Sequence, residues 1–215
     1  MKIYLDSANL EDVSRALESG MIDGVTTNPS IIAREGRPFK ACIEDILRMG
    51  PRLTVLAEVV SGNAAGMEAE ARDLASLGAA IVIKLPCTAE GISAARRLSG
   101  SGIRTTVTLV FSLNQAIAAA CAGADFVAPF VGRLDDIDSD GIGLVRSIKE
   151  TLVAHSMKTQ VIAASVRSPF SVSRLFIAGA DIVTLPFKLL GQMIQHPLTD
   201  QGMAAFERDW AKVPG

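Results

Sequence analysis

Short hydrophobic runs recur along the chain, each followed by a polar or Gly/Pro turn and then by a stretch with the periodicity of an amphipathic helix. Runs such as AAIVIKLP and ADIVTLP are almost continuously apolar, which is typical of strands covered on both faces. The pattern predicts eight strands: Lys2–Asp6, Gly24–Thr27, Thr54–Val60, Ala80–Pro86, Arg104–Leu109, Phe126–Pro129, Gln160–Ala164 and Ile182–Leu185.

The spacing of these strands predicts the fold. Their starts lie roughly 22 to 34 residues apart, which is about the length of one strand-plus-helix unit. Eight such units in 215 residues predict one α/β domain, residues 1–215, folded as a (β/α)8 or TIM barrel. A doubly wound open sheet is the main alternative, although it usually has fewer strands and no GxGxxG follows the first strand.

A further amphipathic segment, residues 199–213, follows the eighth unit. Met203, Phe206 and Trp210 are apolar at helical spacing, and Thr199 is a candidate N-cap. We therefore predict an additional C-terminal helix that packs at an interface with another subunit.

The longest uncharged run, residues 105–124, is long enough to span a bilayer, but polar residues interrupt it. Ser112 and Gln115 form a capping box, so the run divides into a buried strand and a new helix. The N-terminal segment lacks the apolar core of a signal peptide. These features predict a cytoplasmic protein without a membrane segment.

Charge and cysteine content argue against further classes of protein. The 21 Lys and Arg nearly balance the 23 Asp and Glu, and aromatic residues make up 5% of the chain, which argues against a nucleic-acid partner. Three widely spaced cysteines without a CxxC pair indicate a reduced protein with neither a disulfide framework nor a structural zinc site.

Polar residues lie where the predicted strands end. In a barrel of parallel strands these ends share one face, where active sites are built. Seven of the eight predicted strands bring a candidate functional residue to that face: Asp6, then Thr26 and Asn28, Glu58, Lys84, Thr108, Phe130 with Arg133, and Ser165 with Arg167.

Lys84 carries the sharpest signal, because it interrupts the apolar strand Ile-Val-Ile-Lys-Leu-Pro. Burial disfavours the charged ammonium and lowers the pKa of an amine, as a nucleophile attacking a carbonyl requires. A structural ion pair with Asp6 or Glu58 is the alternative interpretation. With two carboxylates and Thr108 at neighbouring strand ends, we favour Schiff-base chemistry.

The two carboxylates, Asp6 and Glu58, can move protons to and from substrate hydroxyls. A metal site or a plain charge network would use the same residues. Neither histidine, His155 or His196, belongs to a predicted strand end, which weakens a zinc site but leaves an all-carboxylate magnesium site open.

Arg133, Ser165 and Arg167 follow the sixth and seventh strands. Two guanidinium groups and a hydroxyl suit a substrate phosphate. Simple solvation of surface arginines is the alternative.

With these residues in place, the chain resembles the transaldolase family, in particular its short-chain branch, which includes fructose-6-phosphate aldolase. The resemblance runs the whole length and rests on six segments: YLDSAN at 4–9, GVTTNPS at 24–30, VIKLPCTAEG at 82–91, TLVFS at 108–112, APFVGRLDD at 128–136 and AASVR at 163–167. It implies a Schiff-base enzyme that acts on sugar phosphates and needs no metal or organic cofactor.

The resemblance also implies residue roles. Lys84 matches the Schiff-base lysine, and Asp6 matches the carboxylate that takes the proton of the substrate C4 hydroxyl. Glu58 and Thr108 match the pair that holds the catalytic water. The remaining matches bind substrate: Thr26 and Asn28 line the site, and Arg133, Ser165 and Arg167 form the phosphate-binding set. The branch commonly forms decamers or pentamers, with the C-terminal helix reaching over a neighbour.

Two positions divide the family. Fructose-6-phosphate aldolases typically carry Gln where Glu58 stands and Tyr where Phe130 stands, so this chain resembles the transaldolases, which transfer dihydroxyacetone rather than release it. Thr106 stands where many transaldolases have Asn, and Ala128 where longer members have Ser; both are expected to touch the three-carbon unit. The alternatives are an aldolase that releases free dihydroxyacetone and a non-catalytic sugar-phosphate-binding barrel.

Overall fold

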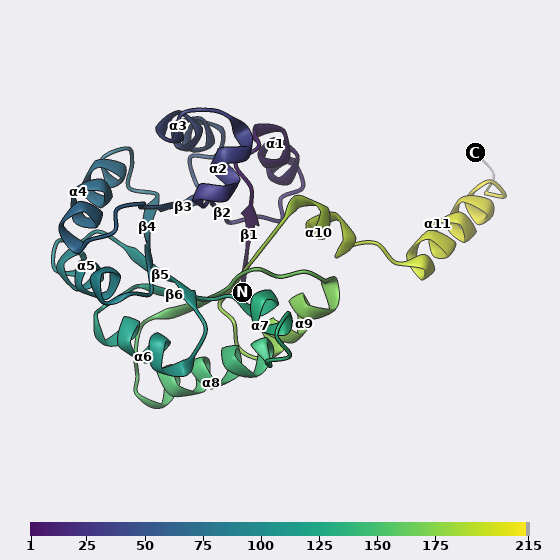
Figure 1. The fold of residues 1–215 in the computed structure, drawn as a ribbon. Coiled ribbons are helices and arrows are strands. Elements are labelled where there is room, and N and C mark those ends of the chain that lie inside the picture. Colours follow the sequence, from purple (N-terminus) through teal and green to yellow (C-terminus); the bar gives the residue numbers. More distant parts are fainter. Residues whose placement is uncertain (214–215) are drawn as a thin grey trace.

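The computed structural model describes residues 1–213 and contains a closed barrel of eight parallel strands, in the order of the sequence. Figure 1 shows the helices arranged around this barrel. The strands are β1 Lys2–Asp6, β2 Gly24–Thr26, β3 Thr54–Glu58, β4 Ile81–Pro86, β5 Thr105–Val110, β6 Phe126–Pro129, β7 Gln160–Ala163 and β8 Ile182–Leu185.

Helices connect the strands, and two connections contain more than one helix. The helices in the described part of the chain are α1 Leu10–Glu18, α2 Pro29–Glu35, α3 Phe39–Met49, α4 Ala64–Ala75, α5 Ala89–Ser99, α6 Leu113–Cys121, α7 Val131–Asp135, α8 Gly141–Ala154, α9 Pro169–Ile177, α10 Phe187–Gln192 and α11 Pro197–Trp210.

The pairing of the first and last strands decides between the two predicted topologies. β1 pairs with β8 in parallel, with Lys2 opposite Ile182 and Leu5 opposite Leu185, so the sheet closes and the open doubly wound alternative is wrong. All eight predicted strands are present, and their ends differ from the predicted ones by at most two residues, the usual uncertainty of strand ends.

Two packed cores give each strand a defined inner and outer face. The larger core lies between the sheet and the helices, and the smaller one fills the barrel with Tyr4, Leu56, Val82, Phe126, Ala128, Ile162 and Ile182. Side chains alternate across a strand, so the residue two positions after an inner residue also points inward. This alternation places Asp6, Glu58, Lys84, Phe130 and Thr184 above the apolar plug, at the end where the strands finish.

Aspartate side chains form hydrogen bonds to the strands at the opposite end of the barrel. The repeated Ala-Gly-Ala-Asp segments end at Asp125 and Asp181, and each side chain accepts a hydrogen bond from the first part of the preceding strand. The three bonds of this kind run from Ile3 N to Asp23, from Thr105 N to Asp125 and from Val161 N to Asp181, at 3.2, 2.8 and 2.8 Å. A strand N–H that would otherwise lack a partner is thereby satisfied.

The uncharged run 105–124 divides as predicted, into β5 and α6. Ser112 caps α6, because its Oγ accepts a hydrogen bond from Gln115 N at 3.2 Å, and the Gln115 side chain accepts one from Phe111 N at 2.7 Å. Among residues 1–213, no helix combines the length and the apolar character needed to cross a membrane.

The C-terminal helix α11 extends away from the barrel (Figure 1) and has no buried residue. It begins at Pro197, so the prediction of a start capped by Thr199 is wrong. Proline at the first helical position is preorganised for a helix, and His196 is the N-cap, its Nδ1 accepting a hydrogen bond from Leu198 N at 3.1 Å.

Candidate active site

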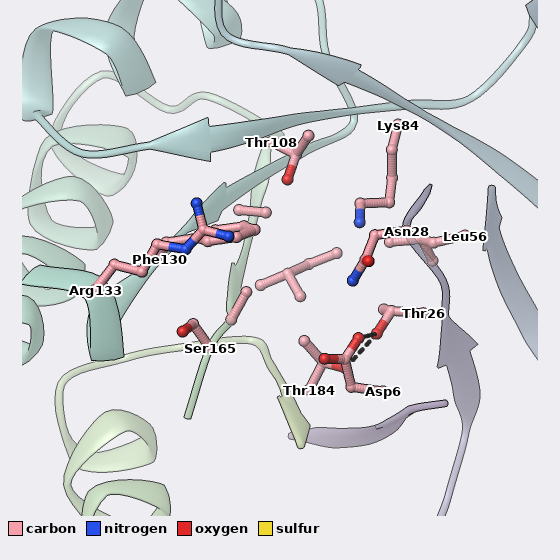
Figure 2. Close-up of a pocket in the computed structure, with 13 residues that line it drawn as sticks. Asp6, Thr26, Asn28, Leu56, Lys84, Thr108, Phe130, Arg133, Ser165 and Thr184 are labelled. Carbon is pink, nitrogen blue, oxygen red and sulfur yellow. Dashed lines mark hydrogen bonds between the residues drawn. The ribbon is translucent and has the colours of Figure 1, made fainter. Parts of the chain in front are cut away.

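A cavity opens at the end of the barrel where the strands finish, directly above the apolar plug (Figure 2). Its volume is about 130 Å³, small beside the roughly 300–1,000 Å³ of sites for drug-sized ligands, so it suits a short polar molecule or one end of a longer one. Its lining comprises Asp6, Thr26, Asn28, Leu56, Lys84, Thr108, Ala128, Phe130, Arg133, Ile162, Ala164, Ser165 and Thr184.

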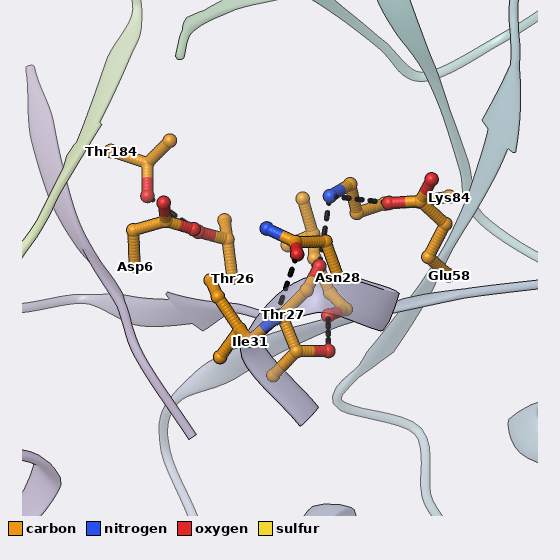
Figure 3. A network of polar contacts seen from close by, with 9 residues as sticks. Asp6, Thr26, Thr27, Asn28, Ile31, Glu58, Lys84 and Thr184 are labelled. Carbon is orange, nitrogen blue, oxygen red and sulfur yellow. Dashed lines mark hydrogen bonds and ion pairs between the residues drawn. The ribbon is translucent and has the colours of Figure 1, made fainter. Parts of the chain in front are cut away.

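Lys84 lies on β4 and is 5% exposed, with its amine at the cavity. The Nζ atom forms an ion pair with Glu58 Oε2 at 2.9 Å and donates a hydrogen bond to the Thr27 carbonyl oxygen at 2.8 Å (Figure 3). Glu58 is the register partner of Lys84 on the neighbouring strand β3. An ammonium must lose a proton before it can attack a carbonyl carbon, and Glu58 Oε2 lies within reach of that proton.

Asp6 faces the cavity from the end of β1. Thr26 Oγ1, one strand away, donates a hydrogen bond to Asp6 Oδ1 at 2.7 Å. Burial raises the pKa of the Asp6 carboxyl above its ordinary value; the Thr26 hydrogen bond and the charge of Lys84 lower it in part, while Glu58 raises it further. A carboxylate with a raised pKa is a better proton acceptor for a hydroxyl than an ordinary one.

Asn28 serves the fold and the cavity with different atoms. Its side-chain oxygen caps α2 by accepting a hydrogen bond from Ile31 N at 2.9 Å, and Pro29 occupies the first turn of that helix. The cap fixes the side chain, and the amide nitrogen, which has no hydrogen-bond partner among the described residues, points into the cavity (Figures 2 and 3).

Thr108 faces the cavity from an irregular part of β5. The register with β6 shifts between Val107 and Val110, and Leu109 has a left-handed φ of 58°. A bulge of this kind redirects the strand beside a site, and a left-handed non-glycine residue costs roughly 1–3 kcal/mol. The Thr108 hydroxyl is buried and has no hydrogen-bond partner among the described residues, so it is available to a ligand or a water molecule.

Arg133 and Ser165 occupy the outer edge of the cavity. The Arg133 guanidinium lies over the Phe130 ring, 5.0 Å from its centroid, and forms no salt bridge within residues 1–213. Gly132 allows the backbone beside Arg133 to approach Ser165 closely, because a Cβ at position 132 would lie 2.1 Å from the Ser165 carbonyl oxygen. An unpaired cation beside a hydroxyl is suited to an anionic group of a substrate.

Comparison with known proteins decides the family. The model of the Transaldolase/Fructose-6-phosphate aldolase family matches residues 3–214. The chain belongs to this family.

Curated relatives match over their full length. Proteins described as "Probable transaldolase" from Pelotomaculum thermopropionicum and Moorella thermoacetica are each 52% identical over 215 residues, which is 99% of this chain and of the relative. A third from Aquifex aeolicus is 50% identical over 216 residues, covering 100% of this chain and 98% of that protein. A solved 3-hexulose-6-phosphate synthase is 16% identical with a TM-score of 0.66, covering 89% of this chain and 92% of its own, which shows the fold alone.

Three residues that the transaldolase resemblance assigns to the site do not line the cavity: Glu58, Thr106 and Arg167. Glu58 lies behind Lys84 and is linked to the cavity by its ion pair with that residue. Thr106 is fully buried below Thr108 on the same face of β5, and its hydroxyl has no partner among the described residues. Arg167 Nη2 donates to Asp136 Oδ2 at 2.6 Å, and a second bond from Nη1 makes this pair bidentate.

Sequence reasoning missed Thr184, which lies on β8 and lines the cavity. Its signal was the same as that of Lys84, a polar residue within an apolar run, Ile-Val-Thr-Leu. Leu56 and Ile162 were missed as well; they form part of both the barrel plug and the cavity lining, and nothing in the sequence distinguishes them from other core residues.

No group of three or more His, Cys, Asp or Glu side chains that could hold a metal ion occurs within residues 1–213. Asp6 and Glu58, which a magnesium site would share, are instead engaged by Thr26 and Lys84, respectively.

Proposed function

We propose that this protein is a transaldolase that transfers a dihydroxyacetone unit from a ketose phosphate to an aldose phosphate through a Schiff base on Lys84. The donor is sedoheptulose 7-phosphate or fructose 6-phosphate, and the reaction belongs to the pentose phosphate pathway in the cytoplasm. The observation that carries the proposal is the buried Lys84 amine, which faces a small polar cavity shared with Asp6. The family match and the relatives described as probable transaldolases support it.

The first half of the reaction forms the covalent intermediate. Glu58 takes a proton from Lys84, and the neutral amine attacks the C2 carbonyl carbon of the donor. The resulting carbinolamine loses water to give an imine, and the proton held by Glu58 returns to its nitrogen to give the iminium. Asp6 then takes the proton of the C4 hydroxyl, the C3–C4 bond breaks, and its electron pair moves toward the iminium nitrogen to give an enamine. The shortened aldose phosphate leaves with its new C1 aldehyde.

The second half reverses these steps on a different aldehyde. The enamine carbon attacks the acceptor carbonyl, and the developing alkoxide takes the proton held by Asp6. Water then hydrolyses the imine, which releases the product and the Lys84 amine. In this proposal Glu58 and Thr108 hold the water that enters and leaves, since Glu58 contacts Lys84 and the Thr108 hydroxyl is unpartnered among the described residues. All steps use side chains of the chain and need no metal or organic cofactor.

The substrate phosphate binds at the outer edge of the cavity in this proposal, where Arg133 and Ser165 lie. Arg167 completes the set only after its guanidinium turns from Asp136 toward the phosphate. Binding energy from a phosphate remote from the reacting carbons can then orient the C2 carbonyl against Lys84. Asn28 offers its amide nitrogen to a hydroxyl of the three-carbon unit.

Transfer rather than release is the outcome we favour, because the residues at positions 58 and 130 are Glu and Phe. Phe130 lines the cavity with an apolar ring that stacks against Arg133 and packs edge-on against Phe111. An apolar wall keeps water away from the enamine, which extends its lifetime until an aldehyde acceptor arrives.

The test is intact-mass measurement and peptide mapping after borohydride treatment with fructose 6-phosphate. We expect an adduct of the mass of reduced dihydroxyacetone on Lys84, and product formation that depends on added erythrose 4-phosphate. Free dihydroxyacetone released at the same rate without an acceptor would indicate an aldolase instead. Binding without any adduct would overturn the Schiff-base proposal and favour a non-catalytic sugar-phosphate-binding barrel.

We further propose that α11 packs on another copy of the chain and that the protein is a homo-oligomer, a pentamer or decamer. The helix buries none of its residues on its own barrel, and Phe206 and Trp210 are 72% and 74% exposed. Together with Met203 these side chains form one apolar stripe, which normally requires a partner surface.

Placing a charge on this stripe is expected to dissociate the assembly. In Phe206→Glu/Trp210→Glu, the ionised carboxylates would have to be buried at the interface, which costs several kcal/mol per subunit. Multi-angle light scattering should give a smaller particle than for the wild type. Arg208→Glu, on the opposite face of α11, is the matched control and should leave the mass unchanged; a monomeric wild type would contradict the proposal.

A further inference from the structure

Three side-chain oxygens form a continuous chain at the seam where the barrel closes (Figure 3). Thr184 Oγ1 on β8 lies 2.6 Å from Thr26 Oγ1 on β2, and Thr26 Oγ1 lies 2.7 Å from Asp6 Oδ1 on β1. Thr26 and Thr184 are 2% and 4% exposed, so bulk water does not compete for these bonds. All three residues line the cavity.

Counting hydrogens fixes the direction of this chain. An ionised Asp6 carries no proton, so the Thr26 hydroxyl must donate to Asp6 Oδ1. A hydroxyl has a single hydrogen, and that of Thr26 is therefore used. The 2.6 Å contact can then exist only if Thr184 donates to Thr26.

We propose that Thr184 is a positioning residue for Asp6: by donating to Thr26, it locks the Thr26 hydroxyl as a donor to Asp6 and reserves the other carboxylate oxygen for the substrate proton. Asp6 Oδ2 forms no hydrogen bond with any of the described residues, in agreement with one oxygen being held by Thr26 and the other being available to substrate. The kinetic consequence rests on the proposed transaldolase reaction, whereas the effect on Asp6 itself does not.

The chain of hydroxyls opposes some of the influences on the Asp6 carboxyl and reinforces others. Burial and Glu58 on β3 favour the protonated carboxyl, whereas Lys84 on β4 and Arg34 on α2 favour the carboxylate. Asp12 and Glu11 on α1 and Glu35 on α2 also line a groove that includes Asp6. A donor chain of two hydroxyls favours the carboxylate, because each hydrogen bond polarises the next. Without Thr184, a larger share of Asp6 is protonated at a given pH, and a protonated Asp6 accepts no proton.

The test replaces the hydroxyl with a methyl group of the same size, in Thr184→Val. We expect the pKa of Asp6 to rise by roughly half a unit to one unit, since the lost hydrogen bond joins two neutral hydroxyls and bonds of that kind have effects of that order. It is measured in the substrate-free protein from the infrared carboxylate band of 13C-aspartate, assigned by its loss in Asp6→Asn. The acid limb of kcat/KM for fructose 6-phosphate should move to higher pH by the same amount and rejoin the wild-type value on the alkaline side.

Two further variants separate positioning from packing. Thr184→Ser keeps the hydroxyl and should restore the wild-type pKa and acid limb. Thr105→Val removes a buried hydroxyl that has no hydrogen-bond partner among the described residues, and should shift neither. If Thr184→Val does not fold, Thr184→Ala takes its place.

An unchanged Asp6 pKa in Thr184→Val, or equal shifts in Thr184→Val and Thr184→Ser, would overturn the inference. Because the infrared titration needs no turnover, a wild type inactive on ketose phosphates would count against the proposed function alone.

Discussion

Lys84→Ala is expected to lose turnover by about 10⁴-fold or more, because without the amine no covalent intermediate can form. The variant should still bind sugar phosphate at the outer edge of the cavity through Arg133 and Ser165. Borohydride with fructose 6-phosphate should add no mass to it. The measurements are steady-state transfer to an aldose phosphate and intact mass on the same sample.

Lys84→Arg is the matched control for charge. It keeps a cation beside Glu58 but offers no amine that forms an imine, so it should be as inactive as Lys84→Ala. In Lys84→Ala, Glu58 loses its partner, and the free energy of unfolding should fall by about 3 kcal/mol. Thermal unfolding checks that both variants remain folded. Substantial activity in either one would show that Lys84 serves the ion pair and not the chemistry.

Asp6→Asn is expected to stop the reaction one step later. The amide cannot take the proton of the C4 hydroxyl, so cleavage should slow by roughly 10²- to 10⁴-fold, the usual contribution of a positioned base. Imine formation at Lys84 does not need Asp6 in the proposed mechanism. Borohydride should therefore trap the whole six-carbon sugar phosphate on Lys84, where the wild type gives the three-carbon adduct.

The same substitution has a predicted effect on stability, with a sign set by the pKa of Asp6. Burial raises that pKa in the folded protein above its ordinary value of 3.8. The contribution of Asp6 to stability is therefore fully present below the ordinary value and is lost as the pH rises through the raised one. The amide introduced by Asp6→Asn does not ionise, so the variant should lack this decrease and be at least as stable as the wild type at neutral pH.

A three-carbon adduct formed at the wild-type rate in Asp6→Asn would contradict the assigned catalytic role of Asp6.

The barrel was predictable because its information is local. Continuous apolar runs such as that around Lys84 are needed wherever a strand is buried on both faces, and their regular spacing allows one strand and one helix per unit. Alternation along each strand then places Lys84 on the same face as Val82, inside the barrel. The C-terminal helix was also predictable from its stripe, although its start at Pro197 was not, because His196 is an uncommon cap.

The sequence by itself determined the strands, their inward residues and the family. Only the tertiary structure decided which groups meet: that Lys84 pairs with Glu58 and that Asp136 holds Arg167. It also decided that Thr184 contacts Thr26, 158 residues away in the chain, and through it Asp6. These contacts depend on the register between strands and on closure of β8 against β1. Hydrophobic pattern specifies which face of a strand is buried, but a hydrogen bond requires two particular atoms within about 3 Å, and only the closed barrel sets that distance.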